Sequence, residues 1–406
     1  MSIEKRNLWI MWVCNFIIAG SMTMVMPFLS LYIETFGEFS DEYVQRWSGF
    51  IFGITFVTAF LMSPIWGRIG DKYGFKPILL INGFGISASI FLMGFMHHVH
   101  GLFLLRLVMG IVTGFIPTSI ALIAKQTPKK IAGETLGILQ MGTVSGTLFG
   151  PLLGGVMADS FGFQYTFIIT ASSIVLATLV VLFGIVEKSN NESKKQKNRP
   201  SRKKVIQIIL QHRMLVSVMG IAFIVQAGLF SIQPLLSLYV SELTSADNVA
   251  FLSGLAFSAT GFGNLLLTKR WGKLGDDIGY DKVMMILLIL AATLIVPQAF
   301  VTDLWQLVIL RFLFGMSIGG MLPCITAYIR MEAPFELQGE VLGYNQSFRF
   351  LGNVFGPMLG GIVSGYVGIS SVFYVTGGLF LLGFWMLWWS VKQTRKVKKP
   401  SPRRGQ

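Results

Sequence analysis

The feature that most constrains this chain is a succession of long apolar stretches that fills almost the whole sequence. A helix needs about 20 mostly apolar residues to cross the hydrocarbon core of a bilayer, whereas a transmembrane β-strand needs only about ten. Twelve stretches meet the helical length: 8–34, 44–66, 78–97, 101–124, 134–158, 162–186, 214–240, 250–270, 283–302, 305–329, 340–363 and 368–391. Hydrophobic residues form 53% of the chain and charged residues 13%, which is unlike a soluble domain. We therefore predict an all-α integral membrane protein with twelve transmembrane helices.

The basic residues predict how these helices are oriented. If both termini lie in the cytoplasm, all but four of the 33 Lys and Arg residues fall in cytoplasmic segments. The exceptions are Arg46 near an outer loop and Arg106, Arg311 and Arg349 within spans. The net charge of +14 is thus mainly a topology signal, and we expect no nucleic-acid partner. We predict a multi-pass protein of a bacterial cytoplasmic membrane with both termini cytoplasmic.

The chain contains an internal repeat. The segment LRLVMG at 105–110 matches LRFLFG at 310–315, and GPLLGG at 150–155 matches GPMLGG at 356–361. An even number of spans separates the copies, so two pseudo-symmetric six-helix bundles should run in the same direction. Parallel repeats of this kind are typical of secondary transporters, whose substrate lies near the midplane between the halves. The predicted parts are an N-terminal bundle at 1–186, a basic cytoplasmic linker at 187–213, a C-terminal bundle at 214–391 and a basic cytoplasmic tail at 392–406.

The loop after the second span carries the sequence GRIGDKYGFK, residues 67–76. Its glycines permit a tight reversal, and Asp71 can interact with the positive end of a helix that starts nearby. The loop resembles the GxxxDRxGRR signature of the major facilitator superfamily, with Lys72 replacing an arginine and Phe75 outside the basic pattern. This resemblance implies a contact at the cytoplasmic face that holds the outward-open state; an ordinary basic turn is the alternative. The implied residues are Gly67, Arg68, Asp71, Lys72, Gly74 and Lys76.

The fifth span carries a second motif, which is similar to the antiporter motif of drug:proton exchangers. Small residues allow close helix packing, and Pro151 removes a helix hydrogen bond. These features predict a hinge-like seam between the halves, with a packing groove unrelated to transport as the alternative. The residues are Gly146, Gly150, Pro151, Gly154 and Gly155, with Gly356 and Pro357 as their partners in the eleventh span. With the start of the chain, the motifs resemble the MdtG-type group of twelve-span multidrug efflux transporters over nearly the whole sequence.

Charged residues inside spans are candidates for the transport site. Arg349 lies ten residues after Gly339 and so near mid-bilayer, which makes it the leading polar-site residue. In the superfamily, spans one, four, seven and ten line the cavity, which implies that Glu34 and Arg106 lie toward its outer part. We hypothesise that protonation of Glu34 weakens its attraction to Arg106 and couples proton entry to substrate release. An interfacial glutamate and a snorkelling arginine are the alternative.

Further candidates for substrate binding come from adaptable and polar side chains on the spans expected to line the cavity. They are Met26, Phe223, Gln226, Phe230, Gln233, Met316, Asn345 and Gln346. Because no acidic residue lies equally deep, the cavity should favour neutral, zwitterionic or anionic compounds over dications.

These observations predict a secondary active multidrug efflux transporter that exchanges small amphiphilic drugs for protons by alternating access. A sugar or metabolite transporter of the same superfamily, importing or exporting, is the alternative. The sequence has no HExxH, GxSxG or GxxxxGK[ST] motif, so we expect neither an enzyme nor an ATP-driven pump. We also expect no metal site and no cofactor. The expected partners are the transported molecule, protons and membrane lipid, with the protein acting as a monomer.

Overall fold

The computed structural model describes residues 3–128, 131–187, 202–334 and 337–398. It contains twelve helical segments long and apolar enough to cross a membrane, which confirms the predicted number of spans. No strand occurs in the described residues, so the predicted all-α class is also confirmed. The linker residues 188–201 and the tail residues 399–406 lie outside the described part of the chain.

The elements of the N-terminal half are α1 (Ile3–Met24), η1 (Met26–Phe28), α2 (Leu29–Glu34), α3 (Asp41–Tyr73), α4 (Phe75–Met93), α5 (Val99–Ile111), α6 (Phe115–Gln126), α7 (Ala132–Phe161) and α8 (Phe163–Gly184). Those of the C-terminal half are α9 (Arg202–Gln211), α10 (Arg213–Ser231), η3 (Gln233–Leu235), α11 (Leu236–Leu243), α12 (Val249–Ile278), α13 (Tyr280–Ile295), η4 (Val296–Phe300), α14 (Leu304–Ile318), α15 (Met321–Glu332), α16 (Gln338–Val367) and α17 (Ser370–Lys398).

Two spans in each half are broken at equivalent places. Pro27 and Pro234 each lie in a short 3-10 turn that interrupts the first and seventh spans, because proline has no N–H to donate. The fourth span breaks between α5 and α6, and the tenth breaks between α14 and α15. A tryptophan braces each of these later breaks: Trp66 donates to the Ile111 carbonyl at 2.6 Å, and Trp271 donates to the Met316 carbonyl at 2.7 Å.

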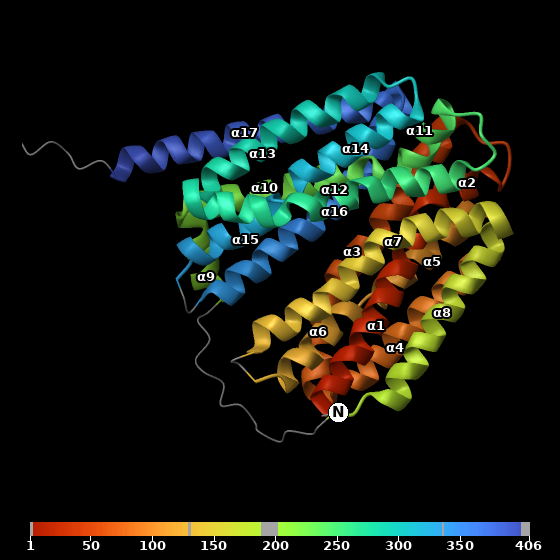
Figure 1. Ribbon diagram of the computed structural model, residues 1–406, viewed down its shortest axis with the longest axis horizontal. Coiled ribbons are helices and arrows are strands. Elements are labelled where there is room, and N and C mark those ends of the chain that lie inside the picture. Colours follow the sequence, from red (N-terminus) through yellow and green to blue (C-terminus); the bar gives the residue numbers. More distant parts are fainter. Residues whose placement is uncertain (1–2, 129–130, 188–201, 335–336, 399–406) are drawn as a thin grey trace, which may run out of the picture.

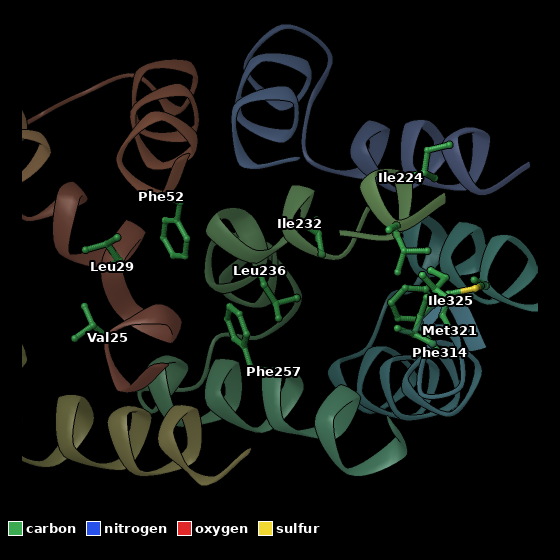
Figure 2. Packing of buried hydrophobic residues seen from close by; sticks show 14 of the residues in the cluster. Val25, Leu29, Phe52, Ile224, Ile232, Leu236, Phe257, Phe314, Met321 and Ile325 are labelled. Atoms are coloured by element: carbon green, nitrogen blue, oxygen red, sulfur yellow. The ribbon is translucent and has the colours of Figure 1, made fainter. Parts of the chain in front are cut away.

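The two halves form separate bundles that meet at one end (Figure 1). We call this the closed end; it holds α2, α11 and the loops 35–40 and 244–248. Toward the other end, which holds α6, α9 and α15, the bundles diverge (Figure 1). Near the closed end, Val25, Leu29 and Phe52 lie across from Leu236 and Phe257 of the other bundle (Figure 2). Apolar packing thus continues from each bundle into the junction.

Part of the segment predicted as a linker is helical. Residues 202–211 form α9, which packs against α10 and α16 with Ile209 buried. Among the residues of this helix whose side chains are described, Ile209 faces the bundle, whereas Ile206 and Leu210 are exposed.

Candidate functional site

Two helix pairs close the junction between the halves at the closed end. In the first seam, α7 packs on α12, and in the second seam, α3 packs on α16. A Cβ placed on Gly155 would lie 2.3 Å from the Ala250 carbonyl oxygen, and one on Gly49 would lie 2.4 Å from the Pro357 carbonyl oxygen. Both seams therefore require glycine, because the two backbones approach each other more closely than any side chain allows.

The antiporter-like motif divides its small residues between two faces of α7. Gly146, Gly150 and Gly154 face α1 inside the N-terminal bundle, where a Cβ on Gly154 would lie 1.9 Å from the Met24 carbonyl oxygen. Pro151 and Gly155 instead face α12, since the Pro151 carbonyl oxygen lies 2.3 Å from a Cβ placed on Gly254. The motif thus packs one bundle internally and also forms the first seam.

The eleventh span repeats this division. Gly356 faces α10, where a Cβ would lie 2.4 Å from the Ala227 carbonyl oxygen, whereas Gly361 faces Gly49 of α3. The carbonyl of Pro357 also faces α3. The sequence repeat is therefore matched by equivalent contacts in the two halves.

Polar contacts also join the halves at the closed end. The Asp159 carboxylate accepts hydrogen bonds from the backbone N–H of Ala250 at 3.2 Å and of Phe251 at 2.6 Å, at the start of α12. The hydroxyls of Ser30 and Ser237, which occupy equivalent positions in the repeat, are 2.7 Å apart. The Arg46 guanidinium lies 4.0 Å from the ring centroid of Tyr366 on α16.

A cavity of about 290 Å³ is lined in part by α3, α7 and α16, which also form the seams, and lies mainly within the N-terminal bundle. Among the described residues of the other half, only Phe230 of α10 and Phe350 of α16 line it, and Phe230 packs on Phe56 with ring centroids 5.1 Å apart. Its full lining is Ile18, Ala19, Met22, Thr23, Met26, Phe52, Thr55, Phe56, Ala59, Ser63, Ile86, Arg106, Met109, Thr113, Phe115, Ile116, Pro117, Thr147, Phe230 and Phe350. This lining is apolar apart from a few hydroxyls and one charge, Arg106.

Arg106 is buried, with 4% of its surface exposed. Its guanidinium lies 5.6 Å from the ring centroid of Phe52, and its backbone carbonyl accepts a hydrogen bond from Thr55. Within the described residues, the side chain forms no hydrogen bond or ion pair with another side chain or the backbone, and its Nε is buried without a partner. The cavity therefore holds a positive charge that the described part of the protein does not neutralise.

Of the substrate-binding and coupling candidates, the structure brings Met26, Arg106 and Phe230 together in this cavity. Glu34 is exposed at the end of α2 and forms no ion pair with Arg106 in this conformation. Their coupling in another conformation stays a prediction.

The other candidates lie elsewhere in the C-terminal half. Arg349 is half-buried and donates to the Gln346 side chain at 2.8 Å. Phe223 packs on Phe355, with ring centroids 5.8 Å apart, and Gln226 packs against Gly352. Gln233 and Asn345 each bury a side-chain oxygen without a partner, and the backbone of Met316 bonds to Trp271. None of these residues lines the described cavity.

One face of α3 lines the cavity instead, and this was not predicted from the sequence. Phe52, Thr55, Phe56, Ala59 and Ser63 follow helical spacing along that face. The signal was present in this spacing and in the two hydroxyl side chains within an apolar span. The superfamily resemblance implied that spans one, four, seven and ten line the cavity. No described residue of the tenth span, which consists of α14 and α15, lines this cavity.

The signature loop lies at the diverging end, where α3 turns into α4 at Gly74 with φ 92°. Arg68 and Lys72 are exposed, and the Asp71 side chain lies outside the described part of the chain. The carboxylate at the start of α4 is that of Glu187, which accepts from the backbone N–H of Phe75 at 2.9 Å and of Lys76 at 3.0 Å. The Lys76 ammonium donates to the Ile185 carbonyl at 2.8 Å. Sequence reasoning placed Glu187 in the linker and missed its role as a helix cap.

Two helical bundles that meet at a closed end, with an apolar cavity lined mainly by one of them, are the arrangement expected of a membrane transporter of small molecules. A sequence model described as Major Facilitator Superfamily matches residues 11–270 and 218–406. The chain belongs to this superfamily.

Relatives and solved structures extend the comparison. An uncharacterized MFS-type transporter, YuxJ of Bacillus subtilis, is 57% identical over 93% of this chain and 96% of its own length. The multidrug resistance protein MdtG of Dickeya zeae is 39% identical over 96% of this chain and 95% of its own. A bacterial homologue of the human lysosomal transporter Spinster, solved in an inward-facing, unoccupied conformation, aligns with a TM-score of 0.80 at 15% identity over 99% of this chain and all of its own. The nucleoside transporter NupG aligns with a TM-score of 0.77 at 13% identity over 97% of this chain and all of its own.

Proposed function

We propose that this protein is a secondary active multidrug efflux transporter that exchanges small amphiphilic compounds for protons by alternating access. The observation that carries the proposal is the apolar cavity next to two glycine-lined seams, which lets one half rock against the other around a bound molecule. The likeness to multidrug resistance proteins MdtG supports efflux as the direction of transport.

The structure corresponds to the inward-facing state in this proposal. Arg68, Lys76 and Arg330 lie near the helix ends at the diverging end, and basic residues that flank the spans predict the cytoplasmic side. The closed end then faces outward, and the cavity would receive its substrate from the cytoplasm or the inner leaflet. The protein would sit in the bacterial cytoplasmic membrane with both termini inside, act as a monomer and contact lipid along its exposed apolar faces.

The test is transport in everted membrane vesicles from a host that lacks its main efflux pumps. Acidifying the vesicle lumen should drive uptake of fluorescent amphiphilic dyes, and addition of a dye should release protons from the lumen. As a control, Gly155→Leu should abolish both signals while the protein still reaches the membrane, because a side chain there collides with the Ala250 carbonyl. Uptake that persists after the proton gradient is collapsed would reject proton antiport. Failure to move any dye or to raise drug resistance would favour a metabolite transporter.

A further inference from the structure

An unpaired buried cation and the start of a helix both line the cavity. Arg106 lines it from α5, and the first residues of α6, Phe115, Ile116 and Pro117, line it as well. A lone guanidinium in an apolar site is unfavourable unless a counter-charge or hydrogen-bond acceptors compensate its lost hydration. No carboxylate lines the described cavity, so a bound molecule is the available source of such a counter-charge.

The two helix ends at the break between α5 and α6 differ in whether their backbone groups have hydrogen-bond partners. At the end of α5 the carbonyls have donors: Trp66 bonds to Ile111 at 2.6 Å, and the Thr113 hydroxyl bonds to Met109 at 2.6 Å. The start of α6 has no such partner, because Gly114 provides no side-chain cap. The first N–H groups of a helix have no acceptor within it and carry its positive dipole end. In α6 these are the N–H groups of Phe115 and Ile116, because Pro117 has none. The break therefore keeps its negative end satisfied and leaves its positive end free for a ligand.

We propose that this cavity binds organic anions, with the anionic group held between the Arg106 guanidinium and the first turn of α6. The apolar body of the ligand would lie against Met22, Met26, Phe52, Phe56, Phe230 and Phe350. A carboxylate, sulfonate or phosphonate on a compact apolar body matches both parts of the surface. The inference rests on the proposed function, because it assigns a substrate class to the same cavity.

The repeat supplies a natural control. Arg311 occupies the position equivalent to Arg106, is also buried and also has an Nε without a partner. The tenth span is broken and braced by Trp271 as the fourth is by Trp66. Arg311 does not line the described cavity, so the two arginines are similarly buried but differ in access to this site.

The experiment measures how tightly three probes bind to the full-length protein in lipid nanodiscs. The probes share one apolar body and differ in the charge of their polar group. These are radiolabelled 4-tert-butylbenzoate, its neutral amide and the cationic 4-tert-butylbenzylammonium. The benzoate should bind at least about tenfold more tightly than the amide, as expected for a charge-assisted hydrogen bond in a buried site. The ammonium should bind most weakly.

Variants then assign the preference to Arg106. Arg106→Gln should bring the benzoate to within about threefold of the amide, Arg106→Lys should keep part of the difference, and Arg311→Gln should keep all of it. Thermal unfolding of each variant checks folding. Similar affinity for the three probes in the unaltered protein would overturn the proposal, as would an equal loss of preference in the two glutamine variants.

Two further measurements separate this inference from its alternatives. Chloride or inorganic phosphate that displaces the benzoate at similar concentrations would indicate an inorganic-anion site and overturn the organic substrate; we expect displacement only at far higher concentrations. In proteoliposomes, dye efflux without any preference for the benzoate would leave the proposed function intact and reject this inference. Arg106-dependent benzoate binding without proton-driven transport would support the anion site and reject the antiport function.

Discussion

At the scale of single residues, Asp159 has the most distinctive contact between the halves. It is the last of three residues, with Pro151 and Gly155, that α7 turns toward α12 at spacings of four. Its position in the repeat corresponds to Gly365, where the Arg46 side chain packs instead. The two seams thus share their glycine packing but end in different polar contacts.

Asp159→Asn should weaken the closed end. An ionised carboxylate accepts the N–H groups of Ala250 and Phe251 more strongly than an amide does, and the helix dipole of α12 adds to this. Because Asp159 is exposed, we expect a loss of only about 1 kcal/mol, or about a fivefold shift toward opening of the closed end.

Pulsed electron paramagnetic resonance between spin labels at Glu38 and Ser245, in the loops of the closed end, measures this shift. Asp247→Asn serves as the control, because it removes another exposed acid just before α12 that makes no such cap. An unchanged distance distribution in Asp159→Asn, or an equal change in the control, would contradict the role of Asp159.

At the scale of elements, the broken fourth and tenth spans have equivalent braces but different surroundings. Trp66 and Trp271 each donate a hydrogen bond to a backbone carbonyl in the last helical turn before the break. Only the break after Ile111 borders the described cavity. In a membrane that carbonyl needs a donor, because lipid supplies none.

Trp66→Phe and Trp271→Phe should therefore destabilise the protein to a similar extent, by about 1 kcal/mol each. Only Trp66→Phe should also weaken 4-tert-butylbenzoate binding, because it frees a carbonyl beside the proposed anion site. Thermal unfolding and equilibrium binding on the same purified samples test the two effects separately. Equal binding losses in the two variants would show that the breaks act on binding through general stability.

The elements also show what the sequence alone predicts. The spans follow from local apolar length, and the parallel bundles follow from the repeat, so both were accessible before the structure. The residues that line the cavity were harder to predict, because positions facing lipid and positions facing the cavity both carry apolar side chains. Phe56 lines the cavity, for example, whereas Leu61 on the same helix is 59% exposed. Adjacent Gly154 and Gly155 face different helices, and no spacing rule identifies which one crosses between halves. The Glu187 cap joins segments distant in sequence and so leaves no local pattern.

At the scale of the whole molecule, the pseudo-symmetric halves contribute unequally to the cavity. The N-terminal bundle supplies nearly all of its lining, while Phe230 and Phe350 cover it from the other side. If the halves rock around a molecule bound in the cavity, separation at the closed end should uncover this cavity to the opposite face of the membrane. The hydrogen bond between Ser30 and Ser237 would have to break in that motion, because it joins the two halves at the closed end.

Ser30→Cys with Ser237→Cys should therefore lock the transporter. The two hydroxyl oxygens are 2.7 Å apart, close enough that sulfur atoms in their place can form a disulfide with little backbone movement. Oxidation should abolish proton-driven dye uptake into everted vesicles, and a reductant should restore it, because a covalent bond across the closed end prevents the outward-open state. Benzoate binding from the diverging end should survive oxidation, which separates a locked transporter from a misfolded one. Each single-cysteine variant should stay active under oxidation, since the native Cys14 and Cys324 are fully buried. Full transport by the oxidised double variant, with the disulfide verified by mass spectrometry, would show that the closed end does not need to open and would reject the rocking mechanism.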